Sequence, residues 1–157
     1  MLICRDAKHS DIDVLIDIRK ILLSSGEGYY SARNDSEESQ WKAAYKQWLE
    51  NNLDKPNIKI LVAVWSSELV GCCIGIIDER VPFRGCLNGK MGWGQSMIVI
   101  PTHRRRGIAK QMMRELCQWF KQQGVEKFAF QSTPMALSIY KNWGCKDSGE
   151  PLLIKEL

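Results

Sequence analysis

Hydrophobic residues recur along the chain with two spacings, and the first predicts a pair of helices near the N-terminus. A short apolar run at 2–4 reads as a strand, and apolar side chains over 12–23 then recur every three or four residues, as on an amphipathic helix. Ser10 with Asp13 resembles a capping box and predicts the start of that helix. A second helical stripe occupies 41–49. The N-terminal third is therefore predicted as a strand followed by two helices.

The middle of the chain changes to the pattern of strands. The apolar runs 60–65 and 69–77 are rich in β-branched residues and are separated by Ser-Ser-Glu at 66–68, which predicts an antiparallel hairpin. A further strand is predicted over about 94–100. A helix follows from Gly107, and the glycine at its far end is a natural cap.

The C-terminal part predicts a strand at 127–131, a short helix at 134–142 and a closing strand or hairpin from Gly144, interrupted at 149–151. Strands and helices thus alternate over much of the chain, which predicts an α/β protein with helices packed on a mixed sheet. The length of 157 residues fits a single domain that spans 1–157.

Composition excludes several classes of protein. Hydrophobic residues make up 45% and charged residues 25%, as in ordinary globular proteins. No apolar run reaches the roughly 18 residues of a membrane helix and no signal-peptide core is evident, so we expect a cytoplasmic protein without a membrane partner. Six cysteines make no Cys-x-x-Cys spacing, which predicts free thiols and no metal site.

One segment, 104–110, is typical of phosphate binding. A helix begins there, so its first turn offers unpaired backbone N–H groups and the positive end of the helix dipole. Small residues let an anion approach the backbone, and arginines add attraction. The candidate cofactor residues are Arg104, Arg105, Arg106, Gly107, Ile108, Ala109 and Lys110. A solvated basic turn is the alternative, whereas neither a nucleotide-hydrolysing loop nor a dinucleotide fingerprint is present.

These motifs resemble those of the GNAT acetyltransferase superfamily. The family's Arg/Gln-x-x-Gly-x-Gly/Ala motif is matched by Arg104, Gly107 and Ala109, and its C-terminal helix with a tyrosine by 134–142, which contains Tyr140. The resemblance implies a mostly antiparallel sheet with helices on both faces. It also implies acetyl-CoA as co-substrate and direct transfer of acetyl to a primary amine of a small molecule or protein.

The resemblance further assigns roles to individual residues. Tyr140 would be the general acid for the departing thiolate, and the backbone of Met97, Ile98 and Val99 would bind the pantetheine arm. Several members carry an acid early in the fourth strand, but this chain has Trp93 there.

The general base must therefore come from elsewhere. The nearby carboxylates are Asp78, Glu79 and Glu27, of which Glu79 is our candidate base.

The acceptor side is expected to include Glu27, Tyr29, Tyr30 and Trp93, with ordinary loop packing as the alternative interpretation. We expect His103 to pack rather than to act as a base. We do not expect a cysteine nucleophile, because family members usually transfer acetyl directly.

Two other functions stay open at this stage. The missing acid in the fourth strand leaves room for a non-catalytic acyl-CoA sensor, although Tyr140 argues against that reading. A nucleic-acid module is disfavoured, because the formal charge of +4 is mild and the arginines lack interleaved aromatics. The acceptor is not identified, and a homodimer is left open.

Overall fold

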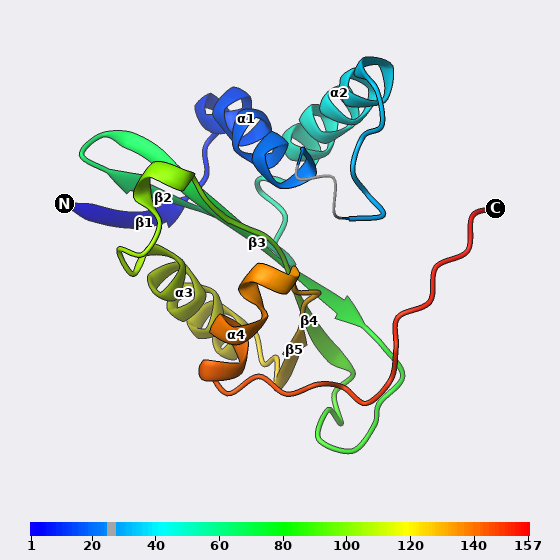
Figure 1. The fold of residues 1–157 in the computed structure, drawn as a ribbon. Helices are drawn as coiled ribbons and strands as arrows, with labels where there is room; N and C mark the ends of the chain where they lie inside the picture. Colours follow the sequence, from blue (N-terminus) through cyan, green and yellow to red (C-terminus); the bar gives the residue numbers. More distant parts are fainter. Residues whose placement is uncertain (25–27) are drawn as a thin grey trace.

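A five-stranded sheet forms the centre of the protein, in a computed structural model that describes residues 1–24 and 28–157 (Figure 1). The spatial order of the strands follows the chain. Neighbours pair antiparallel from the first to the fourth strand, and only the last pair is parallel. The strands are β1 (Leu2–Asp6), β2 (Ile58–Trp65), β3 (Glu68–Glu79), β4 (Lys90–Val99) and β5 (Lys127–Ala129). The prediction of an α/β fold with a mixed, mostly antiparallel sheet is confirmed.

Helices cover both faces of this sheet. α1 (Ile12–Leu23) and α2 (Asp35–Asn52) lie over one face, and α3 (Ile108–Gln122) over the other, with α4 (Pro134–Asn142) on the same side as α3. Two short 3-10 turns, His9–Asp11 and Pro101–His103, precede α1 and α3.

Strand alternation divides the core into two layers. Ile60 and Val62 of β2 pack with α1 and α2, whereas Leu61 and Ala63 point to α3. Cys72 and Cys73 of β3 are divided in the same way. Because both faces of β2 and β3 are buried, these strands read as continuous apolar runs.

The predicted hairpin is confirmed and is closed by a two-residue turn. Ser66 and Ser67 both have positive φ angles, 48° and 75°, as in the type I′ turns that suit the twist of paired strands. β4 begins at Lys90, four residues earlier than predicted, because its glycines resemble a loop in the sequence. A Cβ at Gly75 would lie 2.4 Å from a Leu116 methyl, so such a glycine lets α3 pack closely on the sheet.

The caps of the two N-terminal helices differ from each other. The predicted Ser10–Asp13 capping box is wrong: α1 begins at Ile12, and the carboxylate of Asp11 instead accepts the Lys8 N–H at 2.7 Å. Asn34 caps α2 by accepting the Glu37 N–H at 2.9 Å.

The predicted closing strand after Gly144 is also wrong. Residues 143–157 contain no strand, and most of them are exposed. Gly149 has a positive φ of 82°, and Pro151 has no N–H to give to a ladder, so an extended ladder would be interrupted at 149–151. The segment instead runs along the molecule toward the side of α2 (Figure 1).

Candidate active site

A split in the sheet creates the central feature of the site. β4 and β5 pair at only three positions, from Met91 with Lys127 to Trp93 with Ala129. The rest of β4 has no β5 partner, so its backbone N–H and C=O groups on that edge face a cleft. This edge includes Met97, Ile98 and Val99. Met97 also lines the cleft, whereas the Ile98 side chain is buried in the core beneath α1.

A β-bulge bends β4 at the start of this split. The pairing with β3 shifts between Cys72 and Ile74, and Ser96 takes a positive φ of 51°. Arg19 of α1 donates a hydrogen bond from Nη1 to Ser96 Oγ, and its guanidinium lies 4.6 Å from the centre of the Tyr45 ring. The bulge is therefore held from the α1 side by a stacked arginine.

Tyr140 closes the opposite wall of the cleft. Its ring is 8% exposed and lies 4.0 Å, centre to centre, from Phe130. Burial, with a smaller effect of Cys73 and Cys145, raises the pKa of Tyr140 to about 12. The phenol is therefore protonated at neutral pH and available as a donor.

Cys73 lines the same cleft. Its complete burial raises the pKa of the thiol well above the ordinary value, so the thiolate required of a nucleophile is disfavoured. All six cysteines are free. The cleft therefore offers a phenol donor rather than a thiolate.

The beginning of α3 is the candidate anion site. Gly107 takes a φ of 78° and Arg105 one of 62°, and the first bond of the helix runs from the Gln111 N–H to the Gly107 carbonyl at 3.0 Å. The N–H groups of Ile108, Ala109 and Lys110 come before Gln111, the first intrahelical donor, so they have no acceptor within the helix. A Cβ added at Gly107 would meet no atom within 4 Å, which leaves room for a phosphate group.

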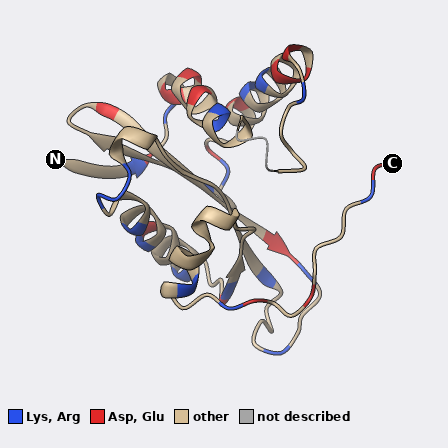
Figure 2. Cartoon of the chain, in the orientation of Figure 1, with Lys and Arg blue, Asp and Glu red and all other residues tan. Residues whose placement is uncertain are grey.

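The arginines of this turn do not all point at an anion. Arg104 Nε donates to the Val99 carbonyl at 3.0 Å, and the Arg106 guanidinium lies 5.4 Å from the centre of the Trp65 ring. His103 lies 6.1 Å from the same ring, where it packs as expected. Figure 2 shows basic residues on the loop before α3 and along that helix, whereas acidic residues gather mainly on α1 and α2.

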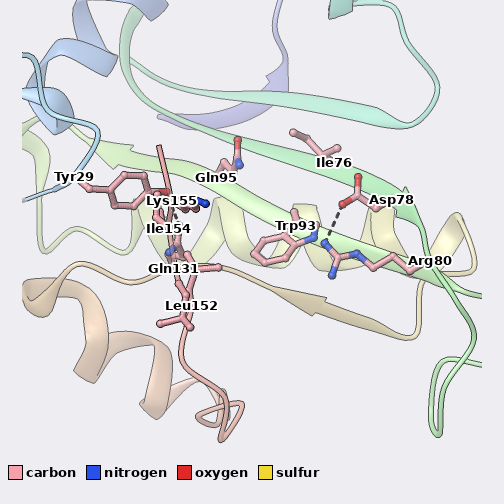
Figure 3. Close-up of a pocket in the computed structure, with 11 residues that line it drawn as sticks. Tyr29, Ile76, Asp78, Arg80, Trp93, Gln95, Gln131, Leu152, Ile154 and Lys155 are labelled. Carbon is pink, nitrogen blue, oxygen red and sulfur yellow. Dashed lines mark hydrogen bonds and ion pairs between the residues drawn. The ribbon is translucent and has the colours of Figure 1, made fainter. Parts of the chain in front are cut away.

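A larger cavity of about 580 Å³ lies at the end of the split and opens on the side of α1 and α2 (Figure 3). Tyr29 and Trp93, two of the residues expected on the acceptor side, line it, and the Tyr29 O–H donates to Gln131 Oε1 at 3.3 Å. Tyr30 does not line the cavity; its ring lies 5.1 Å from that of Tyr29. Glu27 lies outside the described residues.

Asp78, rather than Glu79, faces this cavity. Ile76 and Asp78 line it, whereas Ile77 packs toward α3, so alternation directs Glu79 to that other face. Asp78 accepts from Arg80 at 3.3 Å, and the Arg80 guanidinium lies 5.1 Å from the Trp93 ring centre. Strand alternation was the signal in the sequence that separates the two acids.

The cleft and the cavity share two glutamines, Gln95 and Gln131. The cleft on the Tyr140 side and the cavity on the Asp78 side are therefore adjacent. The C-terminal segment 152–155 forms one wall of the cavity, a contribution that no motif in the sequence signalled.

The sequence and the fold agree with known acetyltransferases. The family model described as the acetyltransferase (GNAT) family matches residues 17–144, so the chain belongs to that family and is an acyltransferase by class. No curated protein matches the sequence.

Solved structures share the fold at low identity. A predicted acetyltransferase from Clostridium acetobutylicum, solved with acetyl-CoA, is 23% identical over 99% of this chain and 96% of that chain, with a TM-score of 0.84. An aminoglycoside N-acetyltransferase in complex with CoA is 16% identical over 99% and 95%, with a TM-score of 0.76. Glucosamine-6-phosphate N-acetyltransferase from Arabidopsis thaliana is 14% identical over 100% and 98%, with a TM-score of 0.71.

Two features are absent from the described residues. None of their helices is long and apolar enough to cross a membrane. They also contain no group of three or more histidine, cysteine or acidic side chains arranged to hold a metal ion.

Proposed function

We propose that the protein is an N-acetyltransferase that passes acetyl from acetyl-CoA directly to a primary amine. The observation that carries this proposal is that Gln95 and Gln131 line both the Tyr140 cleft and the cavity lined by Asp78, so the two lie next to each other. Donor and acceptor could then meet within one complex. Two of the similar structures are named for amine acceptors, glucosamine-6-phosphate and aminoglycosides, which supports an amine here.

The donor site would be formed by backbone groups. When bound, acetyl-CoA supplies a thioester that is activated toward an amine and releases a thiolate. The open first turn of α3 beside Gly107 suits a pyrophosphate, with Arg105 adding charge. The unpaired edge of β4 from Gly94 to Val99 would hydrogen-bond the pantetheine amides, and its N–H groups would polarise the thioester carbonyl.

Tyr140 would act as the donor to the departing sulfur. Its raised pKa of about 12 keeps the phenol protonated at neutral pH. Complete transfer of the proton to a thiolate whose acid has a pKa of about 8.5 is uphill, so a hydrogen bond that stabilises the developing charge is the favoured role. The proton lost by the attacking amine would then neutralise the thiolate.

Asp78 is our candidate to receive the amine, in place of Glu79. An alkylammonium of pKa about 10.4 is almost wholly protonated at neutral pH and must lose a proton before it attacks. The Asp78 carboxylate faces the cavity and would hold the ammonium and accept its proton, directly or through water. This carboxylate also removes the motive for a non-catalytic sensor, which was the missing acid in the fourth strand.

The experiment combines a binding assay with a turnover assay. Acetyl-CoA should raise the unfolding temperature, and CoA thiol should appear when an amine from a broad panel is added. Turnover should require Asp78, so Asp78→Asn should slow it while leaving the stabilisation by acetyl-CoA in place. Stabilisation without thiol release from any amine would refute catalysis and restore the sensor hypothesis.

A further inference from the structure

We infer that Lys155 of the C-terminal segment selects an acceptor amine that also carries an anionic group, a carboxylate or a phosphate. The inference rests on the proposed function and concerns the acceptor side of the same site. It assigns the segment 152–155, which follows the last helix without forming a strand, a place in substrate recognition.

The charges of the cavity support an anionic group on the acceptor. Its charged lining residues are Asp78, Arg80 and Lys155. Asp78 and Arg80 are paired with each other at 3.3 Å through one carboxylate oxygen, so together they add no net charge to the cavity. Among the described residues no acid forms an ion pair with Lys155, and this ammonium therefore gives the cavity its excess positive charge. A polycationic acceptor would be repelled by it.

The geometry gives the two opposite charges separate places. Figure 3 shows Asp78 and Arg80 at one end of the cavity and Lys155 at the other, with Trp93 and Gln95 between them. A compact molecule with one ammonium and one anionic group could place the ammonium toward Asp78 and the anion toward Lys155. The Gln95 amide offers neutral hydrogen bonds between these ends, and the Gln131 amide and the Tyr29 hydroxyl also line the cavity.

The cavity has the size and the walls of a small-molecule site. A volume of about 580 Å³ lies within the range of pockets for compact ligands. Leu152 and Ile154 add apolar wall from the same segment that carries Lys155. The C-terminal segment thus supplies both shape and charge.

The test compares matched acceptors in binding and in turnover. One pair is an amine with a carboxylate and its carboxamide, the second is an amine with a phosphate and its dephosphorylated form, and a polyamine is the cationic probe. Rates are corrected for the fraction of neutral amine. Binding is measured by calorimetry with CoA present, so that it is read without chemistry. The preferred pair tells carboxylate from phosphate.

Lys155→Gln should reduce the preference for the anionic member of the preferred pair by about 3- to 10-fold, the size expected for a partly exposed ion pair. The preference should also weaken at high salt. Lys146→Gln is the matched control. Lys146 is exposed and lies in the same strandless stretch, 143–157, but outside the cavity, so its replacement should leave the preference unchanged.

Three outcomes would overturn the inference: equal binding of both members of each pair, the polyamine as the best ligand, or a preference lost in Arg80→Gln but kept in Lys155→Gln. A binding preference that depends on Lys155 supports the inference even without acetyl transfer, a result that would instead sink the proposed function. Acetyl transfer to neutral and anionic amines alike would support the proposed function and overturn the inference.

Discussion

At the scale of single residues, burial decides which chemistry a side chain can offer. Cys73 and Tyr140 line one cleft and each has a raised pKa, but the consequences are opposite. A thiol must lose its proton to act as a nucleophile, so burial makes Cys73 a poor nucleophile. A phenol must keep its proton to donate, so burial preserves Tyr140 in the form required of a donor.

Removal of the Tyr140 hydroxyl should therefore slow catalysis without loosening the cofactor. We expect Tyr140→Phe to lower kcat by about 100-fold, the lower range for a positioned proton donor, with acetyl-CoA affinity changed less than about 2-fold. Steady-state kinetics and calorimetry check the two quantities. Tyr30→Phe is the control, because Tyr30 is exposed and lies outside the cavity. Equal kcat for Tyr140→Phe and the wild type, with chemistry rate-limiting, would remove the donor role.

The pH profile should reflect the raised pKa of Tyr140. Its value of about 12 in the folded protein exceeds the ordinary 10, so the neutral phenol persists as pH rises. We expect kcat/KM to rise as the acceptor amine loses its proton and not to fall again below about pH 10. A fall near pH 8 or 9 that Tyr140→Phe abolishes would contradict this.

The raised pKa of Tyr140 also makes the stability of the fold depend on pH. Because the folded state holds the phenol proton more tightly than the unfolded state, this contribution is fully present below pH 10. It is lost as pH rises toward about 12.

At the scale of elements, the turn before α3 shows how a local backbone conformation can leave N–H groups open to an anion. Gly107 combines a positive φ with open space, so its backbone can take a shape that other residues resist while leaving an anion unobstructed. Arg104 braces this turn through the Val99 carbonyl at 3.0 Å. The helix start is thereby fixed relative to the open edge of β4.

Gly107→Ala should weaken acetyl-CoA binding by about 10-fold or more, because the methyl group enters the anion space and the backbone resists the positive φ. Calorimetric titration with CoA measures the effect. Gly149→Ala is a matched control, since Gly149 also has a positive φ, 82°, and no neighbour within 4 Å of an added Cβ. Similar losses in both variants would show strain alone and exclude an anion at Gly107.

The sequence predicted elements better than it predicted contacts. The two N-terminal helices, the hairpin and α4 follow from spacing and turn residues, and α4 has the bounds predicted for it. The β4 start was missed because Gly92 and Gly94 look like a loop, although they pair with β3. The apolar residues after Gly144 predict a closing strand or hairpin that the structure does not form. Whether a segment joins a sheet depends on long-range pairing, which the local pattern does not encode.

The candidate site was predicted in the same uneven way. The turn at Gly107 and Tyr140 belong to local motifs, so the sequence alone could nominate them. The cavity combines residues from β3, β4, the loop before α2 and the C-terminal segment, and no local pattern joins these. Asp78 and Glu79 are adjacent in the sequence, yet only strand alternation separates the cavity face from the α3 face.

At the scale of the whole molecule, the two faces of the sheet have different tasks. The face under α3 carries the Tyr140 side of the cleft, and the face under α1 and α2 carries the cavity lined by Asp78. Gln95 and Gln131, at the split between β4 and β5, line both. Any change that shifts α1 relative to the sheet should reach the cleft, since Arg19 joins α1 to Ser96, which lines it.

Asp11 fixes the entry into α1 and should contribute to the stability of the whole fold. Its side chain is 10% exposed and accepts from the Arg5 guanidinium at 2.7 and 3.0 Å and from the Lys8 N–H at 2.7 Å. The hydrogen bonds from Arg5 hold the pKa of Asp11 below its usual range, so its contribution is present above about pH 4 and is lost as pH falls through the lowered folded value. Asp11→Asn should therefore reduce the free energy of unfolding at pH 7 by about 1 to 3 kcal/mol and flatten the loss of stability in acid.

Asp6→Asn is the control. The pair of Asp6 with Lys59 has a similar distance, 2.9 Å, but the Asp6 side chain is 68% exposed, so the change in the free energy of unfolding should stay below about 1 kcal/mol. Denaturant unfolding between pH 7 and 2 measures both variants, and equal effects of the two substitutions would show that Asp11 is one more surface charge rather than the link between β1 and α1.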